Sequence, residues 1–525
     1  MQNSFLTQII VISLACIAFS ACSQNPMVIA NKENLIGYYH KNTKIASFLG
    51  IPFAAPPIGN LRWQGPIPLK EKLTNRLTKE FAAACIQSPR ILDWYRDMAE
   101  IFGSPRDVFP DLKTDEDCLY LNIWTPSPNN KSKLPVMVYV HGGSNNSGWS
   151  YEPNYHGYSL AQKNVVVVSI AYRLGVFGFF SHPEINTNQP SANFGLWDQI
   201  AALKWINKYI ENFGGDPRNV TVFGESAGAQ DILALIFSKQ EKGLFQKAIL
   251  QSNAGFGMKE DSSTLKKERI RGEEFSKAMG DENPLSLEEL RKIDANTILN
   301  RYESIFPDYY HSPAFDNHLL SKLTWDSIMD SEFNDIKLII GSNADETYAW
   351  ISPTVTSKDV ASNAEEIYKD QSKQALKAVE TEDDPRRAID RLYTTDGLMC
   401  PSQFLAHQIN SNNGKAWVYY FDRVRDGEAG SNENVRAYHG AELPYVFDTH
   451  DPWMTTTEKD TALTKILTDY WTQFAKTGSP NAEHLPNWPV FDISKKSVQK
   501  FGDYVGTINS PEPILCDLFF KNATF

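Results

Sequence analysis

Short apolar runs recur along most of the chain, and longer segments separate them. These apolar runs alternate with helix-like stretches, a pattern that is typical of a mostly parallel sheet. Intervening segments such as 230–238 predict helices. The pattern therefore predicts an α/β fold with a large, mostly parallel central sheet flanked by helices, preceded by antiparallel hairpins around 27–51. The runs lie at 136–140, 165–170, 220–223, 248–250, 337–340 and 417–421.

Despite its length, the chain shows no sign of division into several domains. It has 525 residues, but no low-complexity linker or internal repeat interrupts them. The hydrophobic content of 42% is ordinary for a globular protein with a substantial core. We therefore expect residues 23–525 to form a single domain.

The first residues have the pattern of an export signal. Residues 9–19 are almost wholly apolar but too few to span a bilayer, and small residues precede Cys22. We expect a signal peptide over residues 1–21. Phe-Ser-Ala-Cys at 19–22 resembles a bacterial lipoprotein box, after which Cys22 would be acylated and would tether the protein to a membrane. In a bacterium this makes an outer-membrane or periplasmic lipoprotein, and the alternative is simple secretion after cleavage near Ala21.

Charge and motif content argue against several functions. The net charge is −12 and the pI is near 5.4, so the surface would repel the phosphates of a nucleic acid, and no nucleic-acid partner is expected. The chain contains no His-Glu-X-X-His, no Cys-X-X-Cys pair, no P-loop and no dinucleotide fingerprint. We therefore expect neither a metal nor an organic cofactor.

Two glycine-rich segments follow strand-like runs. Gly-Glu-Ser-Ala-Gly at 224–228 lies between the run 220–223 and a predicted helix, a context typical of a nucleophile elbow that presents the Ser226 hydroxyl. Upstream, His-Gly-Gly-Ser at 141–144 ends another run. Backbone N–H groups in such a turn can stabilise negative charge on a carbonyl oxygen, and the N–H of Ala227 is a further donor.

An activated serine needs a base and an acid that orients the base. Chains of the predicted topology carry these groups in the order serine, acid, histidine. Glu346 follows the run 337–340, and His439 lies further along the chain; Asp345 is the less favoured carboxylate. We interpret Ser226, Glu346 and His439 as a candidate triad that only tertiary structure can assemble.

Further motifs resemble the type-B carboxylesterases, which share the cholinesterase-like α/β-hydrolase fold, and in particular their bacterial para-nitrobenzyl-esterase-like members. The resemblance runs through nearly the whole mature chain. It implies a nucleophile, an orienting acid, a general base and three oxyanion donors at Ser226, Glu346, His439, Gly143, Ser144 and Ala227. The motifs are Phe-Leu-Gly-Ile-Pro-Phe-Ala-Ala-Pro-Pro at 48–57, Glu-Asp-Cys-Leu-Tyr-Leu-Asn at 116–122, Asn-Phe-Gly-Leu-Trp-Asp-Gln at 193–199, Phe-Gly-Gly-Asp-Pro at 213–217 and Phe-Ala-Lys-Thr-Gly-Ser-Pro-Asn at 474–481.

The oxyanion loop departs from the family at two positions. Ser144 stands where relatives commonly carry a third glycine, so its Cβ restricts the backbone. Asn145 replaces a frequent aromatic residue, and a more polar acyl entrance is expected.

We also expect loops at 93–115 and 422–434 to rim the entrance. The family lines a narrow gorge with aromatic side chains, for which the candidates here are Trp94, Trp149, Tyr151, Phe256 and Trp350.

The resemblance implies a serine hydrolase that cleaves a small-molecule carboxylic ester through an acyl-enzyme. One alternative is a lipase or thioesterase that uses the same machinery on other acyl groups. Another is a non-catalytic adhesion or binding module, because some animal relatives keep the fold and lose the serine. The residues do not define an oligomeric state.

Four cysteines follow Cys22, and by themselves they allow three pairings. The resemblance implies a bond between Cys85 and Cys118. Cys400 and Cys516 then remain for a second bond. Both bonds would form in an oxidising periplasm or exterior, in agreement with export.

Overall fold

The structure is a computed structural model that describes residues 25–41, 43–238, 243–253, 264–280, 283–307, 309–320, 335–427 and 435–523. The predicted signal peptide at 1–21 and the acylation site at Cys22 lie outside these residues. None of the helices in the described ranges combines the length and the apolar character that crossing a membrane requires.

The described strands form one large sheet of 11 strands and two small sheets. The small sheets are β1-β2-β5 and β6-β7, and the large sheet has the order β16-β15-β14-β13-β12-β11-β9-β10-β8-β4-β3. The strands are β1 (Met27–Ala30), β2 (Glu33–Ile36), β3 (Tyr38–Tyr39), β4 (Ala46–Pro52), β5 (Asn75–Leu77), β6 (Ala84–Cys85), β7 (Thr114–Asp115), β8 (Tyr120–Thr125), β9 (Leu134–Val140), β10 (Val166–Ile170), β11 (Gly215–Glu225), β12 (Lys247–Gln251), β13 (Lys337–Asn343), β14 (Lys415–Phe421), β15 (Ser497–Phe501) and β16 (Gly506–Asn509).

The centre of the large sheet is parallel and its edges are antiparallel. From β10 through β9, β11, β12, β13 and β14 to β15, neighbouring strands run in the same direction. At one edge β3, β4, β8 and β10 pair antiparallel in turn, and at the other edge β15 and β16 do so. The predicted α/β-hydrolase fold, with its mostly parallel sheet and antiparallel N-terminal hairpins, is confirmed.

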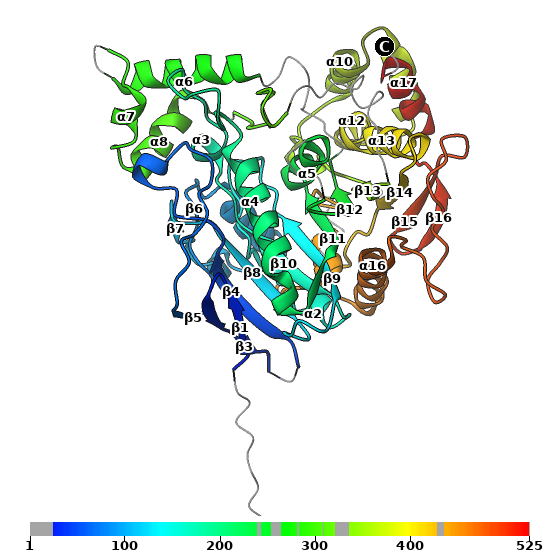
Figure 1. The fold of residues 1–525 in the computed structure, drawn as a ribbon. Helices are drawn as coiled ribbons and strands as arrows, with labels where there is room; N and C mark the ends of the chain where they lie inside the picture. The colour runs from blue at the N-terminus through cyan, green and yellow to red at the C-terminus, as the bar shows by residue number, and fades with distance from the viewer. Residues whose placement is uncertain are drawn as a thin grey trace, which may run out of the picture.

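Helices lie on both sides of this sheet, and most of them connect its parallel strands. In Figure 1, α4 and α5 lie in front of the central strands, and α16 lies at the lower right. The helices are α1 (Arg90–Ile101), α2 (Tyr158–Ala161), α3 (Gly175–Gly178), α4 (Phe194–Tyr209), α5 (Ala227–Phe237), α6 (Leu265–Met279), α7 (Leu287–Leu290), α8 (Ala295–Ile305), α10 (Ser357–Tyr368), α11 (Ser372–Val379), α12 (Pro385–Thr394), the π-helical turn η7 (Thr395–Met399), α13 (Cys400–Ser411), α15 (Leu443–Phe447), α16 (Glu458–Thr477) and α17 (Pro513–Ala523).

The continuous apolar runs reflect burial on both faces of the sheet. Successive side chains of a strand point to opposite faces, so a strand covered on both sides must be apolar at every position. On β9, Val136 and Val138 pack with residues of α4 and α5, whereas Met137 and Tyr139 pack with residues of α15 and α16. The central strands are therefore the middle layer of three.

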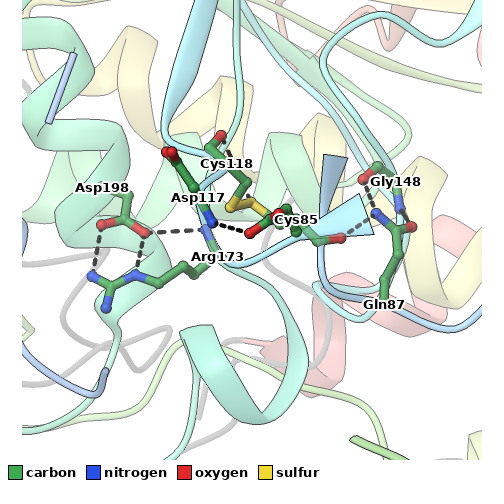
Figure 2. Close-up of a disulfide and its surroundings, with 8 residues drawn as sticks. Cys85, Gln87, Asp117, Cys118, Gly148, Arg173 and Asp198 are labelled. Carbon is green, nitrogen blue, oxygen red and sulfur yellow. Dashed lines mark hydrogen bonds and ion pairs between the residues drawn. A yellow bond between two sulfur atoms is a disulfide. The ribbon is translucent and has the colours of Figure 1, made fainter. Parts of the chain in front are cut away.

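Two disulfides join distant parts of the chain. Cys85 in β6 is bonded to Cys118, and Cys400 at the start of α13 is bonded to Cys516 in α17. The first bond is the one that the family resemblance implied, and the second joins the two cysteines that then remained. Figure 2 shows Gln87 next to the first bond, where its side chain exchanges two hydrogen bonds of 2.7 Å with the backbone of Gly148. The first disulfide is thereby coupled to the glycine-rich loop that begins at His141.

We expect the double substitution Cys400→Ser and Cys516→Ser to lower the free energy of unfolding by about 2 to 5 kcal/mol, because the bond closes a loop of 116 residues in the unfolded chain. Guanidinium unfolding followed by circular dichroism measures this change. Reductant should lower the midpoint of the unmodified protein and leave that of a variant lacking all four cysteines unchanged. Equal midpoints for the double variant and the unmodified protein would contradict the prediction.

Candidate active site

Ser226 lies at a sharp turn between β11 and α5. Its backbone has φ 55° and ψ −124°, a strained conformation for a residue with a side chain. The Ser226 N–H donates to the carbonyl of Gln251 at 2.9 Å, and its own carbonyl accepts from Gln230. A Cβ on Gly228 would lie 2.2 Å from the carbonyl oxygen of Val140, so only glycine allows the helix to approach the sheet so closely.

The glycine-rich loop after β9 packs directly on this turn. A Cβ on Gly142 would lie 3.1 Å from the Cβ of Ser226, so the loop and the turn are in contact. Gly143 has φ +95°, and a Cβ there would lie 2.0 Å from the carbonyl oxygen of Ser147. Ser144 has φ 58°, which a residue with a Cβ adopts at some cost, so the serine keeps the left-handed backbone that a glycine would have. Gly143 and Ser144 line the same cavity as Ser226.

Asn145 does not form a polar entrance as expected. It is fully buried, and its amide donates to Asp231 Oδ1 at 3.1 Å and to the carbonyl of His311 at 3.0 Å. The Tyr172 hydroxyl donates to the Asn145 side-chain oxygen. The side chain therefore secures the base of the glycine-rich loop instead of lining the cavity.

Glu346 and His439 are adjacent in the structure. Glu346 lies just beyond β13 and is 1% exposed. One of its carboxylate oxygens accepts from the backbone N–H of Asn343 at 2.7 Å, and the other lies 2.6 Å from His439 Nδ1. His439 lies in the turn before α15 and lines the cavity with Ser226, while Glu346 lies behind it. The three residues singled out from the sequence are thus brought to one place.

Asp345 has a different set of contacts from its neighbour Glu346. Its Oδ1 accepts from Arg436 Nε at 2.7 Å, and its Oδ2 accepts from the backbone N–H of Ala437 at 3.2 Å. Both partners lie just before His439. Asp345 therefore holds the loop that carries the histidine and does not contact the imidazole through these bonds.

Glu225, the residue before the serine, also contacts the histidine. Its Oε1 lies 3.0 Å from His439 Nε2. Burial raises the pKa of Glu225 to about 8, although the charge of His439 lowers it. Burial lowers the pKa of His439, but the carboxylates of Glu225 and Glu346 outweigh this and raise it above its ordinary value. Sequence reasoning missed this contact, since the motif indicates only that a glutamate adjoins the serine.

A third buried glutamate, Glu442, lies behind this cluster. Glu442 accepts from the side-chain amides of Gln251 at 2.8 Å and Asn343 at 2.6 Å. Both amides belong to the ends of central strands, β12 and β13. Burial raises the pKa of Glu442, and the negative charge of Glu346 raises it further. The histidine therefore lies in a pocket whose charged neighbours are mainly carboxylates.

The cavity above Ser226 has a volume of about 150 Å³, and aromatic side chains form part of its walls. Trp350 lies against His439, with ring centres 5.6 Å apart, and against Trp94 at the same distance. Of the expected gorge residues, Trp94 and Trp350 line the cavity; Trp149 and Tyr151 pack beside it, and Phe256 lies outside the described residues. The other aromatic walls are Tyr95, Tyr155, Tyr438 and Trp453.

Helix α1 contributes much of one wall. The segment 93–115 was expected as a loop, but its first part continues α1, and Ile91, Trp94 and Met98 from this helix face the cavity. Of the second expected rim loop, residues 428–434 lie outside the described residues. The sequence signal that could have indicated α1 is its apolar spacing, at Ile91, Trp94, Tyr95 and Met98.

Comparisons with known proteins agree on one family. A family model described as "Carboxylesterase family" matches residues 25–509. Fumonisin B1 esterase of Sphingopyxis macrogoltabida is 33% identical over 486 residues, which cover 88% of this chain and 84% of that protein. A medium-chain fatty acyl-CoA hydrolase precursor of Anas platyrhynchos is 31% identical over 95% of this chain and 93% of its own. Among solved structures, a PNB esterase superimposes with a TM-score of 0.80 at 28% identity, over 94% of this chain and 99% of its own.

Proposed function

Because this chain belongs to the carboxylesterase family and is a carboxylic ester hydrolase, we propose that Ser226, His439 and Glu346 form its catalytic triad. The observation that carries the assignment is geometric. The serine and the histidine line one cavity, and the buried carboxylate contacts the far nitrogen of the histidine at 2.6 Å. This is the arrangement in which an acid orients a base toward a nucleophile.

In the proposed reaction, His439 Nε2 takes the proton of Ser226 Oγ as that oxygen attacks the ester carbonyl. For this step Nε2 exchanges its contact with Glu225 for one with the neighbouring serine. Glu346 accepts the hydrogen bond from Nδ1, which selects the tautomer with a basic Nε2 and stabilises the imidazolium that forms. The histidine returns the proton to the departing alcohol, and water then releases the acid from Ser226 by the same steps in reverse.

The proposed oxyanion donors are the backbone N–H groups of Gly143, Ser144 and Ala227. Three positive-φ residues in succession, Gly143, Ser144 and Asn145, turn the loop toward the cavity, and Ala227 begins the helix behind the serine. Backbone donors held in this way stabilise the developing negative charge without reorganising during the reaction. Ser144 contributes through its N–H, so its hydroxyl is not part of the mechanism.

Labelling with a fluorophosphonate tests the triad. We expect the phosphonyl group on the peptide that contains Ser226, identified by mass spectrometry, and a large drop in labelling rate for His439→Gln. Ser144→Ala is the matched control, because this serine lines the same cavity and its hydroxyl is not the proposed nucleophile. Phosphonylation of another residue, or undiminished labelling of His439→Gln, would refute the assignment.

Glu225 contributes to the pH above which His439 is neutral and can act as a base. A histidine must be neutral to act as a base, so a carboxylate that raises its pKa moves the acidic limb of the kcat/KM profile to higher pH. Glu225→Gln removes one such carboxylate, and we expect the limb to move to lower pH by about one unit. The measurement is p-nitrophenyl acetate hydrolysis as a function of pH. Glu152→Gln, a buried glutamate of the same cavity, should leave the limb in place; a stationary limb in Glu225→Gln would argue against this role.

The size of the cavity favours small acyl groups. A space of about 150 Å³ that is lined in part by aromatic side chains has little room for a long chain. We therefore propose a carboxylesterase acting on short esters in preference to a lipase or thioesterase, although one relative is named a fatty acyl-CoA hydrolase. Hydrolysis of p-nitrophenyl acetate, butyrate and palmitate decides between these, and faster turnover of the palmitate ester would favour the lipase. Absence of any serine-dependent turnover in a folded preparation would favour the non-catalytic binding module.

We further propose that residues 23–525 form one exported domain and that Cys22, which precedes it, is acylated. Two disulfides favour an oxidising compartment, where such bonds persist. Metabolic labelling with palmitate should modify the natural protein and not a Cys22→Ser variant. Absence of labelling from both proteins would indicate simple secretion, and labelling that survives the substitution would place the acyl group on another residue and refute the assignment to Cys22.

A further inference from the structure

The small sheet β1-β2-β5 has one apolar outer face. The register places Met27 of β1 opposite Ile36 of β2, and Ile36 opposite Leu77 of β5, so three apolar side chains form a row across the sheet. The next row on this face contains Ile29, Asn34 and Asn75, and the two asparagine side chains are hydrogen-bonded at 2.8 Å.

This outer face is exposed to solvent, whereas the inner face is not. Met27, Ile29 and Leu77 are 57%, 57% and 72% exposed. Leu73, just before β5, is 89% exposed. On the inner face Val28 and Leu35 are buried in the main core. Exposed apolar side chains in a contiguous group indicate an interaction surface, because single ones are normal but a row is not.

The same region is basic in an otherwise acidic protein. Residues 25–80 contain eight Lys and Arg against three Glu, whereas the whole chain has a net charge of −12. The two arginines in this segment pair with buried or half-buried glutamates. The charges left at the surface are six exposed lysines and two exposed glutamates, namely Lys32, Lys41, Lys44, Lys70, Lys72 and Lys79 against Glu71 and Glu80.

Helix α4, beside the small sheet, also carries lysines next to apolar side chains. Lys204 and Lys208 line an apolar cavity of about 480 Å³ together with Ile67 and Leu69. The two parts are in contact, because Tyr209 donates to Asn31 at 3.4 Å and Asn212 donates to the carbonyl of Ile29 at 2.8 Å. Exposed apolar groups and lysines thus share one side of the molecule.

We propose that the outer face of β1-β2-β5 docks on the surface of an anionic phospholipid membrane. Apolar side chains enter the boundary between headgroups and acyl chains, and the surrounding lysines are attracted to the anionic headgroups. A second copy of the chain fits this face less well, since a two-fold contact would bring the lysine-rich rims of two copies together.

The outer face begins close to the proposed acylation site at Cys22, which agrees with docking on a membrane. Met27 follows Cys22 by only five residues, which span at most about 18 Å. An acyl group on Cys22 would therefore hold this face, rather than the far side of the protein, within reach of the bilayer. The docking proposal does not require acylation, because its evidence is the exposed face and its charge.

The test uses the chain from Ser23 to Phe525, which contains the whole described fold and lacks the acylated cysteine. We expect it to co-sediment with phosphatidylglycerol–phosphatidylethanolamine vesicles at low salt, and much less with phosphatidylcholine vesicles. Replacing Met27, Ile29, Leu73 and Leu77 together by serine should weaken partition into the anionic vesicles by at least about tenfold. Lys70→Glu with Lys72→Glu should weaken it as well and reduce its salt dependence.

The matched control replaces four apolar residues that are exposed elsewhere. Ile270, Val490, Tyr504 and Ile514 are 41% to 57% exposed, and changing them to serine should leave partition unaltered. All variants should keep the esterase rate on soluble p-nitrophenyl acetate, which shows that they are folded. Equal partition of the two serine variants, or no vesicle binding by the parent chain, would overturn the proposal. Self-association that disappears in the first variant, without vesicle binding, would show instead that copies of the chain meet at this face.

Discussion

Ser226→Ala is expected to lower kcat/KM for p-nitrophenyl butyrate by about four to six powers of ten. The substitution removes the attacking oxygen, so no acyl-enzyme can form. The oxyanion donors would remain, and the residual rate above that of water would come from them and from binding alone. Because Ser226 is held at a strained φ of 55°, alanine inherits the same backbone strain and the fold should persist.

Initial rates for the variant and the parent protein, at equal concentrations of folded chain, measure this loss. Circular dichroism and the unfolding midpoint confirm that the two preparations are comparable. Ser144→Ala should retain most of the activity, because the proposed contribution of residue 144 is its backbone N–H. A Ser226→Ala rate within about a hundredfold of the parent protein would exclude the acyl-enzyme mechanism at this residue.

The second large effect concerns stability. Arg173, which follows β10, and Asp198 on α4 form a fully buried ion pair, with side chains 4% and 0% exposed. The guanidinium donates to both carboxylate oxygens at 2.7 Å, and the backbone N–H of Arg173 donates as well, as Figure 2 shows. Asp198→Ala leaves the guanidinium buried without its carboxylate. We expect the free energy of unfolding to fall by about 3 to 5 kcal/mol.

Urea unfolding followed by fluorescence measures the change, and the surface pair of Asp216 and Arg218, with side chains 18% and 84% exposed, is its control. Arg218 is 84% exposed, so Asp216→Ala should cost no more than about 1 kcal/mol. Equal losses in the two aspartate variants would show that burial of the Arg173 pair does not determine its contribution. The buried pair also adjoins the active-site loop, because Gly175 donates to the carbonyl of Asn145 at 2.6 Å.

Local pattern was sufficient for the strands and for the turn at the serine. A strand covered on both faces must be apolar at every position, so β9, β10, β12, β13 and β14 could be read as continuous runs. The turn at Ser226 needs glycine at 224 and 228 because the backbone of Val140 approaches both positions. The apolar strands and the two glycines could be recognised because each reflects close packing within the central sheet and its adjoining turn.

Contacts between distant segments were not readable in this way. Glu225 approaches His439 only because β11 and the turn before α15 end at the same edge of the sheet. Asn145 was expected at the entrance, but its side-chain amide donates hydrogen bonds to Asp231 and to the carbonyl of His311, which lie behind the loop. Helix α1 was expected as a loop because the segment 93–115 is long and charged, yet Leu92, Tyr95 and Ala99 of this helix pack in a small core of their own.

The sequence by itself determined the α/β architecture, the turn that presents Ser226 and the identity of the residues proposed for the triad. The architecture and the turn depend on residue types at short spacing, where backbone geometry and burial leave few alternatives. Glu346 and His439 were instead identified by their order along the chain and by the family resemblance. Only the tertiary structure decided that Glu225 faces the histidine, that Asp345 holds its loop, and that a basic, apolar sheet face lies exposed near the N-terminus. These depend on side chains meeting across the fold, and their free energies are set by burial and charge at positions that sequence spacing does not specify.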